Sequence, residues 1–304
     1  MDFPRSFYEY RPAAHFLVSD EDAADFLQSQ FSNDLRPFGA GRCTYGLWLD
    51  VKGKVIADSV VLCEGEESFR VISRRCPGER ITAHLERHII ADDVLVEPRE
   101  PGVAFELSAG GVEALGLELP SPGSVARVDG GVLFAARGAH YSMHVDSGAG
   151  ADAIRGKLSA AGFAAMTEAE HGLARIAAGI PLVPDEIGEG DLPGEGELER
   201  DAVSFTKGCY LGQEVVARMH NIGKPQRRLF VVQGKAAPPE LPRPLKNADE
   251  KAVGELRSVY PDGGEAWAGV AILKTRFADL GSKLFDGLNE VSVIRPLREG
   301  VRND

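Results

Sequence analysis

One short stretch of the sequence, residues 207–214, combines a lysine, a cysteine and a Gln-Glu pair. Gly208 and Gly212 separate these side chains, and glycine lets a backbone turn where a side chain would block it or hold it away from a ligand. Lys207 stands two positions before Cys209, and a nearby cation favours the thiolate form of a cysteine. The stretch therefore predicts a reactive thiol on a tight loop, with Cys209 at its centre.

Several kinds of chemistry remain open for Cys209. The thiol could be a redox partner, a transient iron–sulfur ligand or a one-carbon acceptor. A stable cluster usually takes four ligands, so a cluster role needs a second chain or small thiols. A nucleophile in a hydrolase or transferase needs a nearby base, for which His220 and His171 are the candidates, and an orienting acid. The plain alternative is a small buried residue beside a turn.

The surroundings of this stretch are apolar at its ends and strongly charged. The apolar residues Val203 and Phe205 precede it, and the apolar run 215–217 follows it. Such residues are expected to anchor the two ends of the loop in a hydrophobic core. Residues 185–201 are acidic. Positive side chains gather around the loop: Lys207, Arg218, Lys224, Arg227 and Arg228. The cluster suits an anionic small molecule, and the alternative is a solvated face that flanks a turn.

Composition limits the partners. The chain of 304 residues fits two or three packed units, and 43% hydrophobic with 26% charged residues is typical of a soluble globular protein. A net charge of −12 argues against direct nucleic-acid binding. Apolar runs stay far below the roughly 20 residues of a membrane helix, so no membrane partner is expected. Residues 1–5 lack a signal-peptide pattern, which predicts a cytoplasmic location.

Metal sites and disulfides are not expected. The four cysteines are scattered and form no CxxC pair: Cys43, Cys63, Cys76 and Cys209. His140 and His144 stand four residues apart, which on a strand places them on one face but too far apart to share a metal ion. No metal ligand is therefore assigned.

The patterns of the whole chain predict an α+β fold that ends in a small β-barrel. A start box at Ser19 and Asp22 opens a helix to residue 31. Further helices are expected over 78–88 and 149–161. A glycine- and acid-rich loop is expected over 184–196, which covers the stretch 207–214 or is mobile. Short strands are expected over 45–49, 55–62, 68–73, between 94 and 145 with a hairpin at 127–134, and over 229–234, 253–260, 267–273 and 291–296.

Asp58 is the second candidate for chemistry, because it lies inside the apolar strand 55–62. A carboxylate buried in such a strand needs a partner. Asp58 is therefore a site residue, or it faces solvent or pairs with an arginine.

The run "SFTKGCYLGQEVVAR" closely resembles the KGC-(Tyr/Phe)-x-GQE signature of YgfZ-type folate-binding proteins. These are relatives of the glycine-cleavage T-protein, an aminomethyltransferase, and act in iron–sulfur protein maturation. The continuation "ARMHNIGKPQRRLF" is similar to the branch of the mitochondrial iron–sulfur assembly factor. The resemblance spans nearly the whole chain. It implies T-protein-like folate-binding domains around a central cavity over 1–225, as two interlaced α+β subdomains, and a C-terminal barrel over 226–304.

The resemblance also implies site residues. "LDVKGKVIAD" places Asp58 at the acidic position that takes part in folate chemistry, and "LPGEGEL" places Glu195 at another. In "HGLARIAAGIPL", Arg175 and Gly179 fit the family, but Ala177 stands where T-proteins carry a glutamate that contacts the pterin ring. Losing that carboxylate removes a charge-assisted hydrogen bond and argues against pterin binding of the T-protein type.

The roles expected from the signature are as follows. Lys207 stabilises a thiolate or binds a folate carboxylate, while Cys209, Lys207 and Asp58 form the reactive set. Arg218 and Arg228 hold the glutamate tail of the folate by bidentate contacts. The full set expected to bind tetrahydrofolate or a derivative is Asp58, Arg175, Glu195, Lys207, Gly208, Tyr210, Gly212, Gln213, Glu214, Arg218 and Arg228.

Two functions follow from the resemblance. In the first, the protein binds a folate and assists iron–sulfur client or assembly proteins, with an indirect effect on tRNA modification. In the second, it is a folate-dependent aminomethyltransferase. The KGC motif is not usual in T-proteins, and Ala177 also argues against the second. The first function is therefore preferred, as a maturation factor rather than an enzyme.

Overall fold

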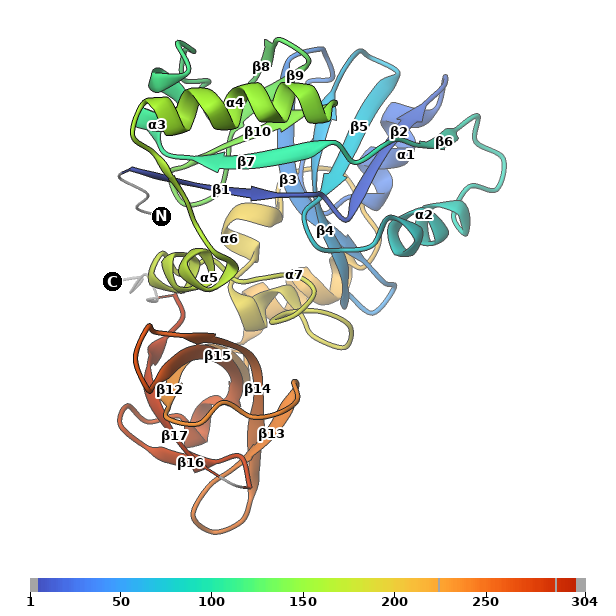
Figure 1. Cartoon of the computed structure of the whole chain (residues 1–304). Helices are drawn as coiled ribbons and strands as arrows, with labels where there is room; N and C mark the ends of the chain where they lie inside the picture. Colours follow the sequence, from blue (N-terminus) through green and yellow to red (C-terminus); the bar gives the residue numbers. More distant parts are fainter. Residues whose placement is uncertain (1–4, 224, 288, 299–304) are drawn as a thin grey trace.

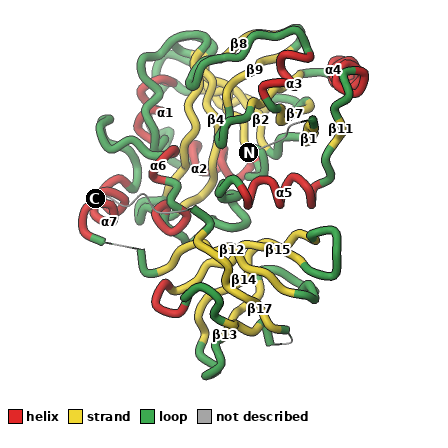
Figure 2. The backbone as a smooth tube through the Cα atoms, turned by 90° about the vertical axis from the view of Figure 1, so that its left-hand side faces the viewer, coloured by secondary structure: helices red, strands yellow, loops and turns green. Residues whose placement is uncertain are grey.

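Two largely antiparallel sheets form the upper body of the molecule, and a closed barrel lies below them (Figure 1). The computed structural model describes residues 5–223, 225–287 and 289–298. Residues 1–4 and Lys224, which entered the sequence analysis, lie outside these ranges. Figure 2 shows the same division after a quarter turn, with α5 (Glu168–Ala177) between the upper body and the barrel.

The first sheet has the strand order β3-β4-β5-β2-β6. Its strands are β2 (Ala14–Ser19), β3 (Arg42–Leu49), β4 (Val55–Cys63), β5 (Ser68–Ser73) and β6 (Leu95–Pro98). The helices α1 (Ala23–Gln30) and α2 (Gly78–Glu86) pack on it. Because side chains alternate along a strand, Ala57 of β4 lies in the core with Leu27 and Leu85, and Asp58 points to the opposite face.

The second sheet has the order β11-β1-β7-β10-β9-β8. Its strands are β1 (Ser6–Tyr10), β7 (Val103–Leu107), β8 (Val125–Val128), β9 (Gly131–Ala135), β10 (Tyr141–Val145) and β11 (Ala164–Ala165). The helices α3 (Ala109–Ala114) and α4 (Gly148–Ala160) pack against it. Phe105, Leu133 and Met143 form a core with these helices, so Glu106 and Phe134, one residue further along, face the other way.

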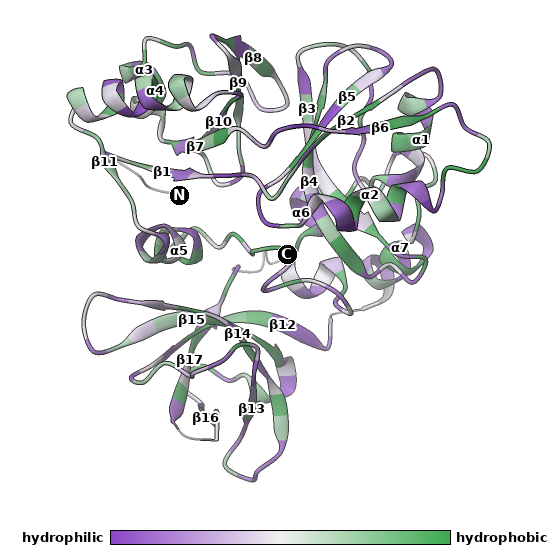
Figure 3. Cartoon of the chain, turned by 45° about the vertical axis from the view of Figure 1, so that its right-hand side comes forward, coloured by the Kyte–Doolittle hydropathy of each residue, from purple (hydrophilic) through white to green (hydrophobic). Residues whose placement is uncertain are grey.

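The edges of the two sheets meet at β3 and β8. The Cys43 N–H donates to the carbonyl of Gly123 at 3.0 Å, and the Val125 N–H donates to the carbonyl of Gly41 at 2.8 Å. The inner faces of both sheets therefore enclose one shared space. Hydrophobic stretches run along the strands of both the upper body and the barrel (Figure 3).

A helical segment joins the sheets to the barrel. It contains α5, the 3-10 helix η1 (Pro193–Gly196), α6 (Glu199–Ala202) and α7 (Gln213–Ile222). The barrel closes in the order β12-β15-β14-β13-β16-β17. Its elements are β12 (Arg227–Gly234), β13 (Arg243–Lys246), β14 (Ala252–Pro261), β15 (Trp267–Lys274), η2 (Thr275–Phe277), β16 (Lys283–Phe285) and β17 (Glu290–Pro296).

The α+β class and the C-terminal barrel are confirmed, with several local differences. The start box at the first helix is not formed, because the carboxylate of Asp22 accepts the N–H of Asp93 instead of capping α1. The strands β1, β2, β13 and β16 and the helix α3 were not expected. The loop over 184–196 is partly buried: Glu186, Asp191 and Glu195 bind arginines. Among the described helices, none is long and apolar enough to cross a membrane.

Candidate functional site

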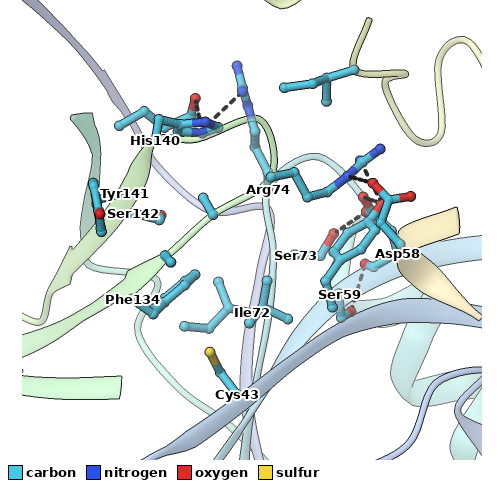
Figure 4. A pocket seen from close by; sticks show the side chains of 18 of the residues that line it. Cys43, Asp58, Ser59, Ile72, Ser73, Arg74, Phe134, His140, Tyr141 and Ser142 are labelled. Carbon is cyan, nitrogen blue, oxygen red and sulfur yellow. Dashed lines mark hydrogen bonds and ion pairs between the residues drawn. The ribbon is translucent and has the colours of Figure 1, made fainter. Parts of the chain in front are cut away.

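A cavity of about 660 Å³ lies between the inner faces of the two sheets. Figure 4 shows Asp58 and Ser73 on one side of it and His140 on the other, with the apolar side chains of Ile72 and Phe134 in the lower part of the view. Ligand sites are commonly of this size, mostly apolar and provided with a few fixed polar groups. The cavity is therefore the candidate binding site.

Asp58 stands at one end of the cavity, where β4 presents it on the inner face. The hydroxyl of Tyr45 donates to its carboxylate at 2.9 Å, and the hydroxyl of Ser73 donates at 3.2 Å. Burial raises the pKa of Asp58, although Arg137 and these donors act in the opposite direction. Asp58 is thus a cavity carboxylate with hydrogen-bond partners and does not project into bulk solvent.

Arg137 completes this end of the cavity. Its Nε donates to the Asp201 carboxylate at 2.9 Å, and its Nη1 donates to the Tyr45 hydroxyl at 2.9 Å. The guanidinium also lies over the Tyr45 ring, 4.5 Å from the centroid. Its Nη2 is buried and finds no hydrogen-bond partner among the described residues. A donor without a protein acceptor is expensive to bury, so this end suits a ligand that carries an acceptor.

A second polar group occupies the other end of the cavity. Glu106 of β7 accepts from Arg74 at 2.8 Å and from His171 at 2.8 Å, and His140 lies 3.2 Å from the same oxygen as His171. Burial opposes ionisation of Glu106, but Arg74 and the two imidazoles outweigh it and hold its pKa well below the usual value. Glu106 is therefore a fixed negative charge at this end.

His144 lines the same cavity from β10. It stacks on Phe134 with ring centroids 5.4 Å apart, and its Nε2 lies 3.0 Å from the Ser142 hydroxyl. Burial lowers the pKa of His144 to about 3. His140 and His144, the two histidines that were considered for a metal ion, thus both face the cavity. His140 lies beside Glu106, and His144 contacts Phe134 and Ser142.

The protein is expected to lose stability in mild acid because of His144. An unfolded histidine binds a proton near pH 6.5, whereas buried His144 binds one only near pH 3, so the unfolded state takes up the proton first. The stabilising effect is complete above pH 6.5 and falls by up to about 1.4 kcal/mol per pH unit below it. Urea unfolding of wild type and His144→Gln from pH 7.5 to 5 measures this.

The matched control is His220→Gln, because His220 is exposed on α7. The pH slope should decrease in His144→Gln and stay the same in the control. Equal slopes in wild type and His144→Gln would contradict the prediction.

Arg175 also reaches the cavity wall, but its guanidinium is already bound. The side chain is only 2% exposed. It forms two hydrogen bonds to the carboxylate of Glu186, at 2.8 and 2.6 Å, and one to the carbonyl of Ile180 at 2.6 Å. This pairing makes Arg175 a structural element of the wall, in contrast to the ligand contact that the resemblance implied.

The signature loop lies outside the lining of the cavity. Cys209 is exposed. Lys207 is buried, and its ammonium donates to the carbonyls of Gln28 and Phe31 at 2.6 Å and of Asn33 at 3.0 Å. Burial lowers the pKa of Lys207 to about 8. The expected role of Lys207, to hold a thiolate or a folate carboxylate, does not match these contacts. Lys207 fixes the loop to the end of α1.

The two glycines of the loop have different surroundings. Gly212 has φ +82°, and a Cβ there would lie 2.5 Å from the carbonyl oxygen of Asp50 and 2.9 Å from the Cα of Gly53. The loop therefore packs backbone to backbone on the turn between β3 and β4, and this contact requires glycine. A Cβ on Gly208 would meet nothing within 4 Å.

The other signature residues are also outside the cavity lining. Tyr210 is buried beneath the Lys207 ammonium, which lies 5.3 Å from its ring centroid. Gln213 and Glu214 form the first turn of α7, and Arg218 is exposed on that helix. These residues shape or surround the Cys209 loop rather than the cavity.

Two residues that were predicted to contact a folate, Glu195 and Arg228, form ion pairs with other residues of the protein instead. Glu195 accepts two hydrogen bonds from Arg227 at 2.8 Å, and Arg228 pairs with Glu197. Neither Glu195 nor Arg228 lines the cavity, so they do not hold a ligand bound there. The described residues therefore separate the expected site into a cavity around Asp58 and an outer loop around Cys209.

The bases proposed for a nucleophilic Cys209 do not fit that role. His171 is buried and is hydrogen-bonded to both Arg74 and Glu106. His220 stacks on Phe205 with ring centroids 4.0 Å apart. Ala177 is exposed and does not line the cavity.

Sequence reasoning missed most of the polar groups of the cavity. Tyr45, Arg74 and Glu106 come from separate segments, Arg137 and His140 share the turn between β9 and β10, and only strand pairing brings these four segments together. Glu106 is a charged residue between apolar ones in the strand "VAFEL". Asp58 was identified by the same pattern, so Glu106 could have been found in the same way.

The sequence is similar to those of known proteins. Residues 6–107 match the family described as the GCVT N-terminal domain. The tRNA-modifying protein YgfZ of Edwardsiella ictaluri is 30% identical over 278 residues, which cover 87% of this chain and 78% of that protein. The protein of the same name from Sodalis glossinidius is 27% identical over 230 residues, covering 73% and 69%.

The fold also matches a solved structure. The glycine cleavage system aminomethyltransferase T from Bartonella henselae superimposes with a TM-score of 0.78, covering 96% of this chain and 86% of that chain. The two sequences are 16% identical, so this likeness concerns the fold.

Proposed function

Because the chain belongs to the YgfZ family, within the superfamily that shares the aminomethyltransferase fold, we propose that it binds a reduced folate in its cavity. We further propose that it acts with iron–sulfur client or assembly proteins, as an accessory factor in their maturation or repair. Its relatives are named tRNA-modifying proteins. For this chain the corresponding effect would be indirect, through iron–sulfur enzymes that thiolate tRNA, since a net charge of −12 disfavours direct binding of tRNA.

The observation that carries the folate proposal is the pair of groups at the Asp58 end of the cavity. The pterin ring of a folate presents N–H donors next to a carbonyl oxygen. The carboxylate of Asp58 can accept from such donors, and the buried Nη2 of Arg137 can donate to such an oxygen. The apolar walls at Ile72 and Phe134 suit the flat rings. The residues present therefore fit the group.

A bound tetrahydrofolate would supply a reduced pterin and a carrier for one-carbon units. The chain's own residues bind and orient it. Tyr45 links Asp58 to Arg137 by hydrogen bonds of 2.9 Å on either side, which fixes both groups before a ligand arrives. Such preorganisation lowers the cost of binding.

The Cys209 loop supports the second half of the proposal. The thiol is exposed, and Lys207 and Gly212 hold the backbone around it. An exposed thiol on a fixed loop can contact another protein, as a redox partner or a transient cluster ligand. An aminomethyltransferase remains the alternative, and only the shared fold favours it.

We expect Asp58→Asn to weaken binding of tetrahydrofolate by about ten- to a hundredfold. This is the loss of affinity that usually follows when a hydrogen bond to a charged group is removed. The amide keeps the size of the side chain and loses the charge. Isothermal titration under anaerobic conditions measures the affinity.

Arg218→Ala serves as the control, since Arg218 is exposed on α7, outside the cavity lining. Its affinity should equal that of wild type. Absence of saturable binding to wild type would refute the folate proposal, and unchanged affinity in Asp58→Asn would remove the assigned role of Asp58.

A further inference from the structure

Arg74 lies at the cavity end opposite Asp58, where Glu106 and His171 bind its two Nη atoms. Its Nη1 donates to Glu106 at 2.8 Å, and its Nη2 donates to the Nδ1 of His171 at 3.0 Å. Nη1 also lies 3.2 Å from the Nε2 of His171, so the imidazole covers the edge between the two Nη atoms. The hydrogen bonds to Glu106 and His171 leave Nε unused, and the Tyr8 hydroxyl also hydrogen-bonds the guanidinium. Glu106 and His171 therefore leave the edge formed by Nε and the outer hydrogen of Nη2 to a ligand.

Two aromatic rings fix the position of this guanidinium. Its central carbon lies 5.0 Å from the ring centroids of both Tyr8 and Tyr10 on β1. The side chain of Arg74 is 20% exposed and lines the cavity. An arginine keeps its charge at any physiological pH, and a planar fork with one free edge is suited to a carboxylate.

The other arginines that line the cavity are used differently. Arg175 is 2% exposed and bound to both oxygens of Glu186. Arg137 is bound to Asp201 and to the Tyr45 hydroxyl at the Asp58 end. Among the described lining residues, Arg74 is thus the arginine with an accessible free edge.

The negative charge beside Arg74 does not block an anion. Glu106 uses one oxygen for Arg74, while its other oxygen lies within 2.8 Å of His171 and 3.2 Å of His140. Its charge is therefore shared among three partners, away from the open edge of Arg74. Tyr8 and Tyr10 keep their protons in the neutral range, because burial raises the pKa of Tyr8 to about 12 and that of Tyr10 still further.

We propose that Arg74 binds the carboxylate tail of the cavity ligand through this open edge, and so selects ligands that carry an anionic group opposite the pterin. The inference rests on the proposed folate function and assigns its tail to Arg74 in place of Arg218 and Arg228. The Asp58 end recognises the ring and the Arg74 end recognises the charge.

The test compares two probes, tetrahydrofolate and tetrahydropteroate, which lacks the glutamate. Wild type should bind tetrahydrofolate about ten- to a hundredfold more tightly, as expected for a charge-assisted contact. Arg74→Met should remove this preference and leave the affinity for tetrahydropteroate unchanged. Arg74→Lys, which keeps the charge without the fork, should retain part of the preference. Anaerobic titration calorimetry measures all affinities.

Arg75→Met is the matched control, because the neighbouring Arg75 pairs with Asp185 and Glu168 and does not line the cavity. It should keep the full preference. Equal binding of both probes by wild type, or equal loss of both in Arg74→Met and Arg74→Lys, would overturn the inference while folate binding stands. Failure of wild type to bind either probe would refute the folate function and the inference together.

Discussion

We expect the Cys209→Ala variant not to rescue cells from which the gene for this protein has been deleted. The activity of a [4Fe–4S] enzyme in these cells should stay as low as in the deletion strain without any rescue. The reason is chemical, since a methyl group can neither exchange electrons nor bind iron as a thiolate does. Because Cys209 is exposed, its replacement removes no core contact, and the fold should remain intact. The readout is a [4Fe–4S] enzyme such as a tRNA methylthiotransferase, at matched levels of folded protein.

Two further variants sharpen this experiment. Thr206→Ala changes another exposed residue of the same loop and should rescue like wild type. Cys209→Ser keeps the shape but not the thiol chemistry and should fail to rescue. Full rescue by Cys209→Ala would contradict the proposed role of the thiol and leave a folate-binding scaffold.

Arg175→Met is expected to lower the free energy of unfolding by roughly 3–5 kcal/mol, the usual cost of removing one partner of a buried ion pair. Glu186 is fully buried and accepts two hydrogen bonds from Arg175. Without the guanidinium, its carboxylate must stay unpaired or take up a proton. Urea unfolding at neutral pH measures the change.

The control for this variant is Arg80→Met, which removes an arginine from an ion pair with exposed Glu189. Surface pairs contribute about 0–1 kcal/mol, so this change should be small. If Arg175→Met costs no more than Arg80→Met, the pair with Glu186 does not stabilise the wall of the cavity.

The sequence predicted the elements far better than the contacts between them. The pattern over residues 68–73 predicted β5 with its observed bounds, and the turn before Val55 was expected from its glycine. Asp58 could be found because a carboxylate interrupts an apolar strand. These signals are local, so they can be read without knowing which strands pair.

The site itself depends on pairings that the sequence does not reveal. Arg137 meets Asp58 only because β3 places Tyr45 between them. Lys207 was expected to act on Cys209, two residues away, yet in an irregular loop one of these side chains turns inward and the other outward. Closeness in sequence was therefore a poor guide to contact in the signature loop.

The bond between Lys207 and α1 also constrains how the chain reaches its native state. The ammonium of Lys207 meets the carbonyl of Gln28 across 179 positions of sequence. Closing so long a loop costs chain entropy, and contacts between distant residues slow folding. During synthesis, α1 is made long before Lys207 leaves the ribosome. The carbonyls at the end of α1 therefore have no ammonium partner until residue 207 has been synthesised, so the Cys209 loop is attached to α1 late in the making of the chain.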